Sequence, residues 1–143
     1  MAASDFDQML EAYHLAAAEF VKGNPETYKT LFSQREDVTV ANPFGPVRRG
    51  WTEVAETIGS AATYYRDGEV IGFENVATRV TPDLAYIVEV ERYRAKMGGS
   101  NEVASVSLRT TSVFRPEDGA WKVVHRHADP ITSARPAESV VQK

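Results

Sequence analysis

The chain has 143 residues, of which 43% are hydrophobic and 25% are charged, with a formal net charge of -4 and no cysteine. This length suits one domain that buries roughly two thirds of its unfolded surface, and the lack of cysteine excludes disulfides, thiol nucleophiles and thiolate metal sites. The acidic balance argues against nucleic acid as a partner, and no apolar run approaches the roughly 20 residues that cross a bilayer, so no membrane partner is expected. The first residues, Met1 to Asp5, lack the basic and apolar pattern of a secretory signal, which predicts a cytoplasmic protein.

The first half of the chain predicts three helices. Apolar residues recur at helical spacing in the first segment, and Gly23-Asn24 ends it. Asn24 before Pro25 predicts the start of a short second helix. A short strand then leads into the loop Asn42-Pro43-Phe44-Gly45-Pro46, and a third helix starts at Trp51. The predicted helices span residues 5–22, 25–32 and 51–64, and the strand spans 37–41.

The second half of the chain predicts a β-meander. Four runs rich in β-branched and aromatic residues are separated by short turn signals, and such short connections imply antiparallel neighbours. The predicted strands span residues 69–80, 85–95, 103–114 and 120–128. We therefore expect an α+β fold in which three N-terminal helices pack on a curved antiparallel sheet. Residues 1–130 should form the single domain, and residues 131–143 should form a loose tail.

Two sequence segments resemble a known superfamily. They are Val40-Ala41-Asn42-Pro43-Phe44-Gly45-Pro46, which leads into Arg49-Gly50-Trp51, and the closing Trp121-Lys122-Val123-Val124-His125-Arg126-His127. Together with the order of elements, they resemble the SnoaL-like and ketosteroid-isomerase-like proteins of the nuclear transport factor 2-like superfamily. This resemblance implies a cone-shaped, cystatin-like fold with a pocket at its open end. Because the fold hosts isomerases, dehydratases, cyclases, hydrolases and non-catalytic domains, it does not define the reaction.

Three departures from the ketosteroid isomerases argue against their mechanism. Those enzymes hold a proton-shuttling aspartate in the loop that here carries Asn42, and an amide cannot accept and return a proton at neutral pH. Their oxyanion-stabilising tyrosine matches Ala16 here, and their aspartic acid falls near Thr110. The resemblance therefore implies the fold without steroid isomerisation by that mechanism.

The closing His-x-His strand also resembles the association domain of calmodulin-dependent kinases. That domain binds small acids with pocket arginines, which fall near Glu89, Ser112 and Ala128 in this chain, so none is retained. This second resemblance implies self-association, and we expect a homodimer that joins through the outer face of the sheet.

The closing strand presents two alternative faces to a pocket. Because side chains alternate along a strand, His125, His127 and Asp129 lie on one face and Arg126 lies on the other. The apolar residues at the start of the strand share the histidine face, which favours that face as the inner one. The alignment with the isomerases favours the face of Arg126. Both alternatives stay open, with a preference for the histidines, whose pKa suits proton exchange near neutral pH.

Glu89 is the strongest candidate for an acid or a base. If Gly98-Gly99 forms a two-residue hairpin, Glu89 lies opposite Leu108 and Glu91 lies opposite Val106. A carboxylate beside leucine is costly unless it is paired or functional. The alternative is that this face is exposed and that Glu89 pairs with a neighbouring arginine.

These observations predict a cofactor-independent lyase, isomerase or cyclase that acts by proton transfer on a small hydrophobic carbonyl compound. The alternative is a non-catalytic ligand-binding or oligomerisation module. A metal site on the last strand lacks a convincing third ligand elsewhere, so no metal is expected. The predicted catalytic residues are Glu89, His125 and His127. The predicted ligand-binding residues are Tyr13, Tyr28, Asn42, Trp51, Arg126 and Asp129.

Overall fold

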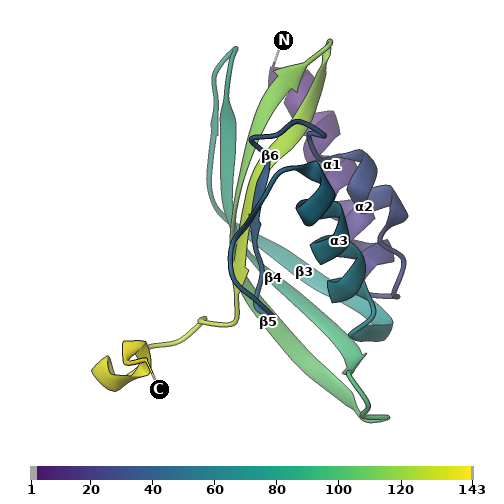
Figure 1. Cartoon of the computed structure of the whole chain (residues 1–143), viewed down its shortest axis with the longest axis vertical. Helices are drawn as coiled ribbons and strands as arrows, with labels where there is room; N and C mark the ends of the chain where they lie inside the picture. The colour runs from purple at the N-terminus through teal and green to yellow at the C-terminus, as the bar shows by residue number, and fades with distance from the viewer. Residues whose placement is uncertain (1–2, 143) are drawn as a thin grey trace.

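Three helices cover the concave face of a curved six-stranded sheet in the computed structural model, which describes residues 3–142 (Figure 1). The helices are α1 (Ala3–Phe20), α2 (Glu26–Thr30) and α3 (Trp51–Ala62). The strands are β1 (Thr39–Ala41), β2 (Arg48–Arg49), β3 (Tyr65–Val80), β4 (Ala85–Met97), β5 (Val103–Glu117) and β6 (Ala120–Asp129). The predicted α+β class is confirmed. Among the described residues, no helix is long and apolar enough to cross a membrane.

The sheet departs from the predicted meander at one edge. Its order is β2-β1-β6-β5-β4-β3, so β3 to β6 form the expected antiparallel meander. Beyond β6, the short strand β1 pairs in parallel, with Val40 beside Arg126. The sheet is therefore mixed rather than fully antiparallel. This pairing matters for the site because it brings the loop after β1 next to the end of β6.

The hairpin between β4 and β5 has a different register from the predicted one. Lys96 pairs with Val103, so residues 98–102 form a longer loop than the expected two-residue turn. Glu89 lies opposite Thr110 rather than Leu108, and Glu91 lies opposite Leu108. Because the register differs by an even number of residues, the inward-facing side chains of β4 remain those expected, and Glu89 and Glu91 are both buried.

A β-bulge in β6 reverses the predicted face of its second half. Val113 pairs with His125 and the next residue of β5 pairs with Val123, which leaves Val124 as an extra residue. The strand faces inward at Val123, and after the bulge the inward residues are Arg126 and Ala128. The prediction that the histidine face is the inner one is therefore wrong, because strict alternation fails at Val124.

Helix α1 packs its apolar side on the sheet and forms the centre of the core. Phe6 contacts Phe114 and Trp121 edge-to-face, with ring centroids 4.9 Å and 5.4 Å apart. Tyr13 makes a similar contact with Phe114 at 5.3 Å. Trp51 is only half-buried and packs at the border of this cluster. After β6 the chain leaves the body (Figure 1). Residues 130–142 are all exposed, including the 3-10 turn at Ala137–Val140.

Gly68 fixes the start of β3 against the end of α1. Its N–H donates to the carbonyl oxygen of Val21 at 3.0 Å. A Cβ at Gly68 would lie 2.2 Å from that oxygen and 2.7 Å from the Val21 Cβ. Only glycine permits this close approach, so Gly68 sets the distance between α1 and the wall formed by β3.

We expect Gly68→Ala to lower the free energy of unfolding by at least about 2 kcal/mol, because the added methyl group collides with backbone atoms that cannot move alone. Gly72→Ala is the matched control, since a Cβ there has no neighbour within 4 Å. Its effect should stay below about 1 kcal/mol. Urea unfolding of both variants measures the difference, and equal effects at the two positions would contradict this account.

Candidate ligand pocket and buried polar network

A cavity lies between the helices and the concave face of the sheet. Its volume is about 40 Å³, which is below the usual range for small-molecule sites, and its mouth is open to solvent. Its walls come from all three helices, from the strands β1 and β3 to β6 and from the loop after β1. Phe44 lines the cavity while 45% exposed, so it marks the opening, where its ring contacts Tyr64 and Tyr65.

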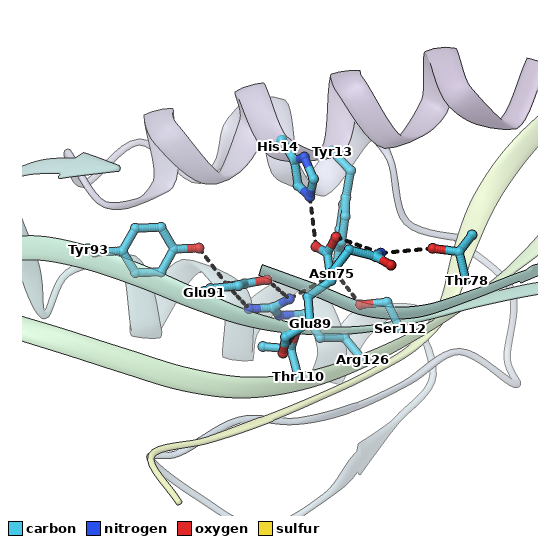
Figure 2. A network of polar contacts seen from close by, with 10 residues as sticks. All are labelled: Tyr13, His14, Asn75, Thr78, Glu89, Glu91, Tyr93, Thr110, Ser112 and Arg126. Carbon is cyan, nitrogen blue, oxygen red and sulfur yellow. Dashed lines mark hydrogen bonds and ion pairs between the residues drawn. The ribbon is translucent and has the colours of Figure 1, made fainter. Parts of the chain in front are cut away.

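A buried ion pair forms the polar part of the wall. Arg126 on β6 donates to both carboxylate oxygens of Glu91 on β4, with N–O distances of 2.9 Å and 2.8 Å. Glu91 is 1% exposed and Arg126 is 9% exposed. Tyr93 donates its hydroxyl to the Glu91 Oε1 at 2.6 Å. Figure 2 shows this network beneath α1. Such two-point pairing, with a further donor, stabilises charges that would otherwise be too costly to bury.

Two hydroxyl groups extend the network toward β5. The Arg126 Nη1 donates to the Tyr13 hydroxyl oxygen at 3.0 Å, and the Tyr13 oxygen lies 2.7 Å from the Ser112 Oγ. Either hydroxyl can be the donor in the contact between Tyr13 and Ser112. Tyr13 therefore holds the guanidinium in place rather than lining the cavity.

Arg126 governs the charge state of Glu91. Burial by itself would raise the pKa of the Glu91 carboxyl, but the charge and hydrogen bonds of Arg126, together with the Tyr93 hydroxyl, outweigh it. The net result is a lowered pKa. Glu91 is thus an ionised carboxylate at neutral pH, and it is a weaker base than an unpaired glutamate.

Two phenols of the cavity wall remain neutral. Burial raises the pKa of Tyr65 to about 12, although Arg126 opposes the shift. Burial likewise raises the pKa of Tyr28 well above its ordinary range. Both hydroxyls keep their protons at physiological pH, and neither donates to another group among residues 3–142. They are available as hydrogen-bond donors to a ligand.

Asn42 lines the same cavity from the loop after β1. Its Oδ1 accepts the backbone N–H of Phe44 at 3.0 Å. This contact fixes the orientation of the amide, so the NH₂ group is the part left for other partners. The loop is held close to Arg126 by the parallel pairing of β1 with β6.

Glu89 belongs to a separate cluster on the β3 side of α1. The Nε2 of His14 lies 2.7 Å from the Glu89 Oε1, and the Asn75 Nδ2 donates to its Oε2 at 3.1 Å. The His14 ring stacks on Phe73, with centroids 3.8 Å apart. Glu89 is 1% exposed and its side chain is outside the cavity wall. Figure 2 shows the two carboxylates on one strand with different partners.

The predicted histidines lie on the outer face of the sheet. The Nδ1 of His125 lies 2.8 Å from the Thr39 Oγ1, and the Nε2 of His127 lies 2.7 Å from the Asp129 Oδ2. Burial lowers the pKa of His125, and the neighbouring His127 adds to this effect. Burial would raise the pKa of Asp129, but hydrogen bonds from Arg109 and His127 lower it to about 2. These residues form an outer-face cluster that does not line the cavity.

The predicted site residues therefore divide into two groups. Of the predicted ligand-binding residues, the cavity wall contains Tyr28, Asn42 and Arg126. The wall does not contain Glu89, His125, His127, Tyr13, Trp51 or Asp129. Within the described residues, no cluster of three or more His, Asp or Glu side chains could hold a metal ion.

Sequence reasoning missed two polar residues of the wall, Glu91 and Tyr93. A signal for both existed. Glu91 and Tyr93 continue the inward alternation that starts at Glu89, and the three together form a polar stripe on an otherwise apolar face. The β-bulge turns Arg126 inward, where it pairs with Glu91 at the cavity.

The domain model for the SnoaL-like domain matches residues 6–132. The chain belongs to the SnoaL-like family. Among solved structures, it is similar to a candidate dehydratase of the nuclear transport factor 2-like family from Streptomyces avermitilis, with 22% identity, a TM-score of 0.73 and coverage of 91% of this chain and 96% of that chain. A comparison with curated protein sequences finds no match.

Two other structures support the same fold. A nuclear transport factor 2-like superfamily protein from Salmonella enterica serovar Typhimurium has a TM-score of 0.74 at 18% identity, with 94% of each chain covered. A ketosteroid isomerase-like protein from Erwinia carotovora atroseptica has a TM-score of 0.73 at 16% identity, with 91% of this chain and 96% of that chain covered. These likenesses confirm the predicted cone-shaped, cystatin-like fold of this SnoaL-like domain.

We expect Arg126→Met to lower the free energy of unfolding by about 3–5 kcal/mol, because it leaves the Glu91 carboxylate buried without its cation. The double variant Glu91→Leu/Arg126→Met should lose less than the single variant, since no charge is then left unpaired. Arg92→Ala, which breaks the exposed pair with Glu74, is the control and should change stability by less than about 1 kcal/mol. Urea unfolding measures the stability of each variant. A double variant that is less stable than Arg126→Met would contradict the role of the unpaired Glu91 carboxylate.

Acid should lower the free energy of unfolding of the wild-type protein, because the Glu91 carboxylate becomes protonated. Because its pKa is lower in the folded chain than in the unfolded chain, its contribution is complete above the unfolded value of about 4.3 and is lost as the pH falls through the folded value. We expect the stability difference between the wild type and the Glu91→Leu/Arg126→Met variant to shrink in this range. Thermal unfolding as a function of pH measures it, and a difference that does not change with pH would contradict this role.

Proposed function

We propose that the chain binds a small, mostly apolar carbonyl compound in its cavity and catalyses proton transfer on it without a cofactor, as a lyase, isomerase or cyclase. The observation that carries this proposal is the ionised Glu91, buried in the wall of a largely apolar cavity beside neutral phenols. An apolar cavity excludes water and strengthens each polar interaction inside it.

In this proposal Glu91 takes the role of base that the sequence had assigned to Glu89. Its Oε2 accepts only from Arg126 among the described residues, so a lone pair is left for a proton. Glu91 would remove a proton from the carbon next to the carbonyl group. The resulting enolate oxygen would accept hydrogen bonds from the hydroxyls of Tyr28 or Tyr65. The proton then returns at another carbon in an isomerisation, or a leaving group departs in an elimination.

Of the other predicted residues, the proposal keeps Arg126 and Asn42 as ligand-binding groups. Tyr13 becomes a positioning residue, because its hydroxyl accepts a hydrogen bond from the guanidinium on the side of α1. Glu89 becomes a second positioning group, since it ties α1 to the sheet through His14. His125, His127, Asp129 and Trp51 have no part in the cavity chemistry.

The second candidate function is binding without turnover. It is favoured by the two hydrogen bonds that Arg126 donates to the oxygens of Glu91. It is also favoured by the lowered pKa of Glu91, which makes this carboxylate a weaker base. The descriptions of the structural relatives as a candidate dehydratase and a ketosteroid isomerase-like protein favour catalysis.

We also propose that the protein is a cytoplasmic homodimer that joins through the outer face of the sheet. The support is the set of exposed apolar side chains along β3 and β4. They are Ile71, Val76 and Tyr86.

Proton transfer can be tested without knowing the natural substrate. We expect the wild type to accelerate hydrogen–deuterium exchange next to the carbonyl group of cyclohexyl methyl ketone in D₂O, followed by NMR. Glu91→Gln keeps the shape but removes the base, so exchange should fall by about 100-fold or more while the ketone still binds. Glu74→Gln, on the exposed surface, is the control and should retain the wild-type rate. Saturable binding with no acceleration by the wild type would favour the binding module instead.

A further inference from the structure

We infer that the cavity selects compounds whose polar end is an uncharged hydrogen-bond acceptor, and that Glu91 is the residue that excludes carboxylates. This inference rests on the proposed function, since it concerns what the same cavity binds. It divides the possible ligands into neutral ketones, esters or amides, which are accepted, and acids, which are rejected.

The charge balance of the cavity wall is the first support. Glu91 and Arg126 are the charged side chains among its lining residues, and they pair with each other. Tyr28 and Tyr65 remain neutral phenols. The wall therefore has no net charge. A ligand carboxylate would add a second buried negative charge for a single guanidinium, and a low-dielectric site makes such a surplus costly.

The geometry of the ion pair is the second support. Planar guanidinium groups bind carboxylates through two parallel N–H donors, and Glu91 already takes this position on Arg126 with contacts of 2.9 Å and 2.8 Å. A third N–H interaction of the same guanidinium goes to the Tyr13 hydroxyl. Glu91 thus acts as a built-in carboxylate that occupies the Nη1/Nη2 edge of the guanidinium.

The hydrogen-bonding groups that remain are the third support. Of the five N–H donors of Arg126, three are used by Glu91 and Tyr13 within the described residues. The hydroxyls of Tyr28 and Tyr65 and the NH₂ group of Asn42 are further donors at the wall. A ligand with an acceptor oxygen satisfies these donors, and a carbonyl oxygen does so without adding charge.

A matched series of three compounds tests the inference. Cyclohexyl methyl ketone, cyclohexanecarboxamide and cyclohexanecarboxylate share one apolar body and differ in the charge of the polar end. We expect the ketone and the amide to bind the wild type at least about tenfold more tightly than the carboxylate at neutral pH, as measured by calorimetry or ligand-observed NMR.

Glu91→Gln should reverse this preference, because it leaves the positive charge of Arg126 without a partner. We expect the carboxylate to gain at least about tenfold in affinity, while the ketone changes by less than about threefold. Glu74→Gln removes one exposed negative charge and is the control for net charge; it should keep the wild-type preference.

A second measurement uses only the wild type, in case Glu91→Gln does not fold. Lowering the pH through the pKa of the acid ligand itself converts it to a neutral compound, so its affinity should rise toward that of the amide. If the carboxylate binds the wild type as tightly as the ketone at neutral pH, the inference is wrong and the binding function stands. If none of the three compounds shows saturable binding, the proposed function fails, and the inference fails with it.

Discussion

The buried ion pair between Glu91 and Arg126 is the constraint on which the rest of the site depends. It links β4 to β6 across the intervening strand β5, and Tyr13 connects it to α1. Charges in such an interior are tolerated only when their geometry and their further hydrogen bonds are good. The surrounding side chains therefore have to hold one arrangement. The same requirement places a polar patch in a cavity that is otherwise apolar.

A single extra residue determines which groups form that patch. Without the bulge at Val124, strict alternation would place His125 and His127 in the cavity and Arg126 on the outer face. Glu91 would then be buried without a cation, which is far more costly than one unpaired residue in a sheet ladder. The bulge and the ion pair thus support each other, since the bulge brings the guanidinium to the one carboxylate that needs it.

The sequence predicted the fold well because periodicity and turn residues carry most of that information. The three helices and the four-strand meander lie within a few residues of their expected bounds. The register of the β4–β5 hairpin could not be predicted from Gly98-Gly99, since a glycine pair fits a two-residue turn and a longer loop equally well. Val124 has no local signal for a bulge either, so the inner face of β6 depended on long-range packing.

The two inward carboxylates of β4 show why the candidate site was harder to predict than the fold. Glu89 and Glu91 are two residues apart on one face and equally buried, so a local pattern cannot rank them. Their difference comes from distant partners, since His14 on α1 pairs with Glu89 and Arg126 on β6 pairs with Glu91. Each carboxylate has its own hydrogen-bonding partner from a different element. This separate pairing leaves the wall of the cavity without net charge, which is the physical basis for expecting a neutral ligand there.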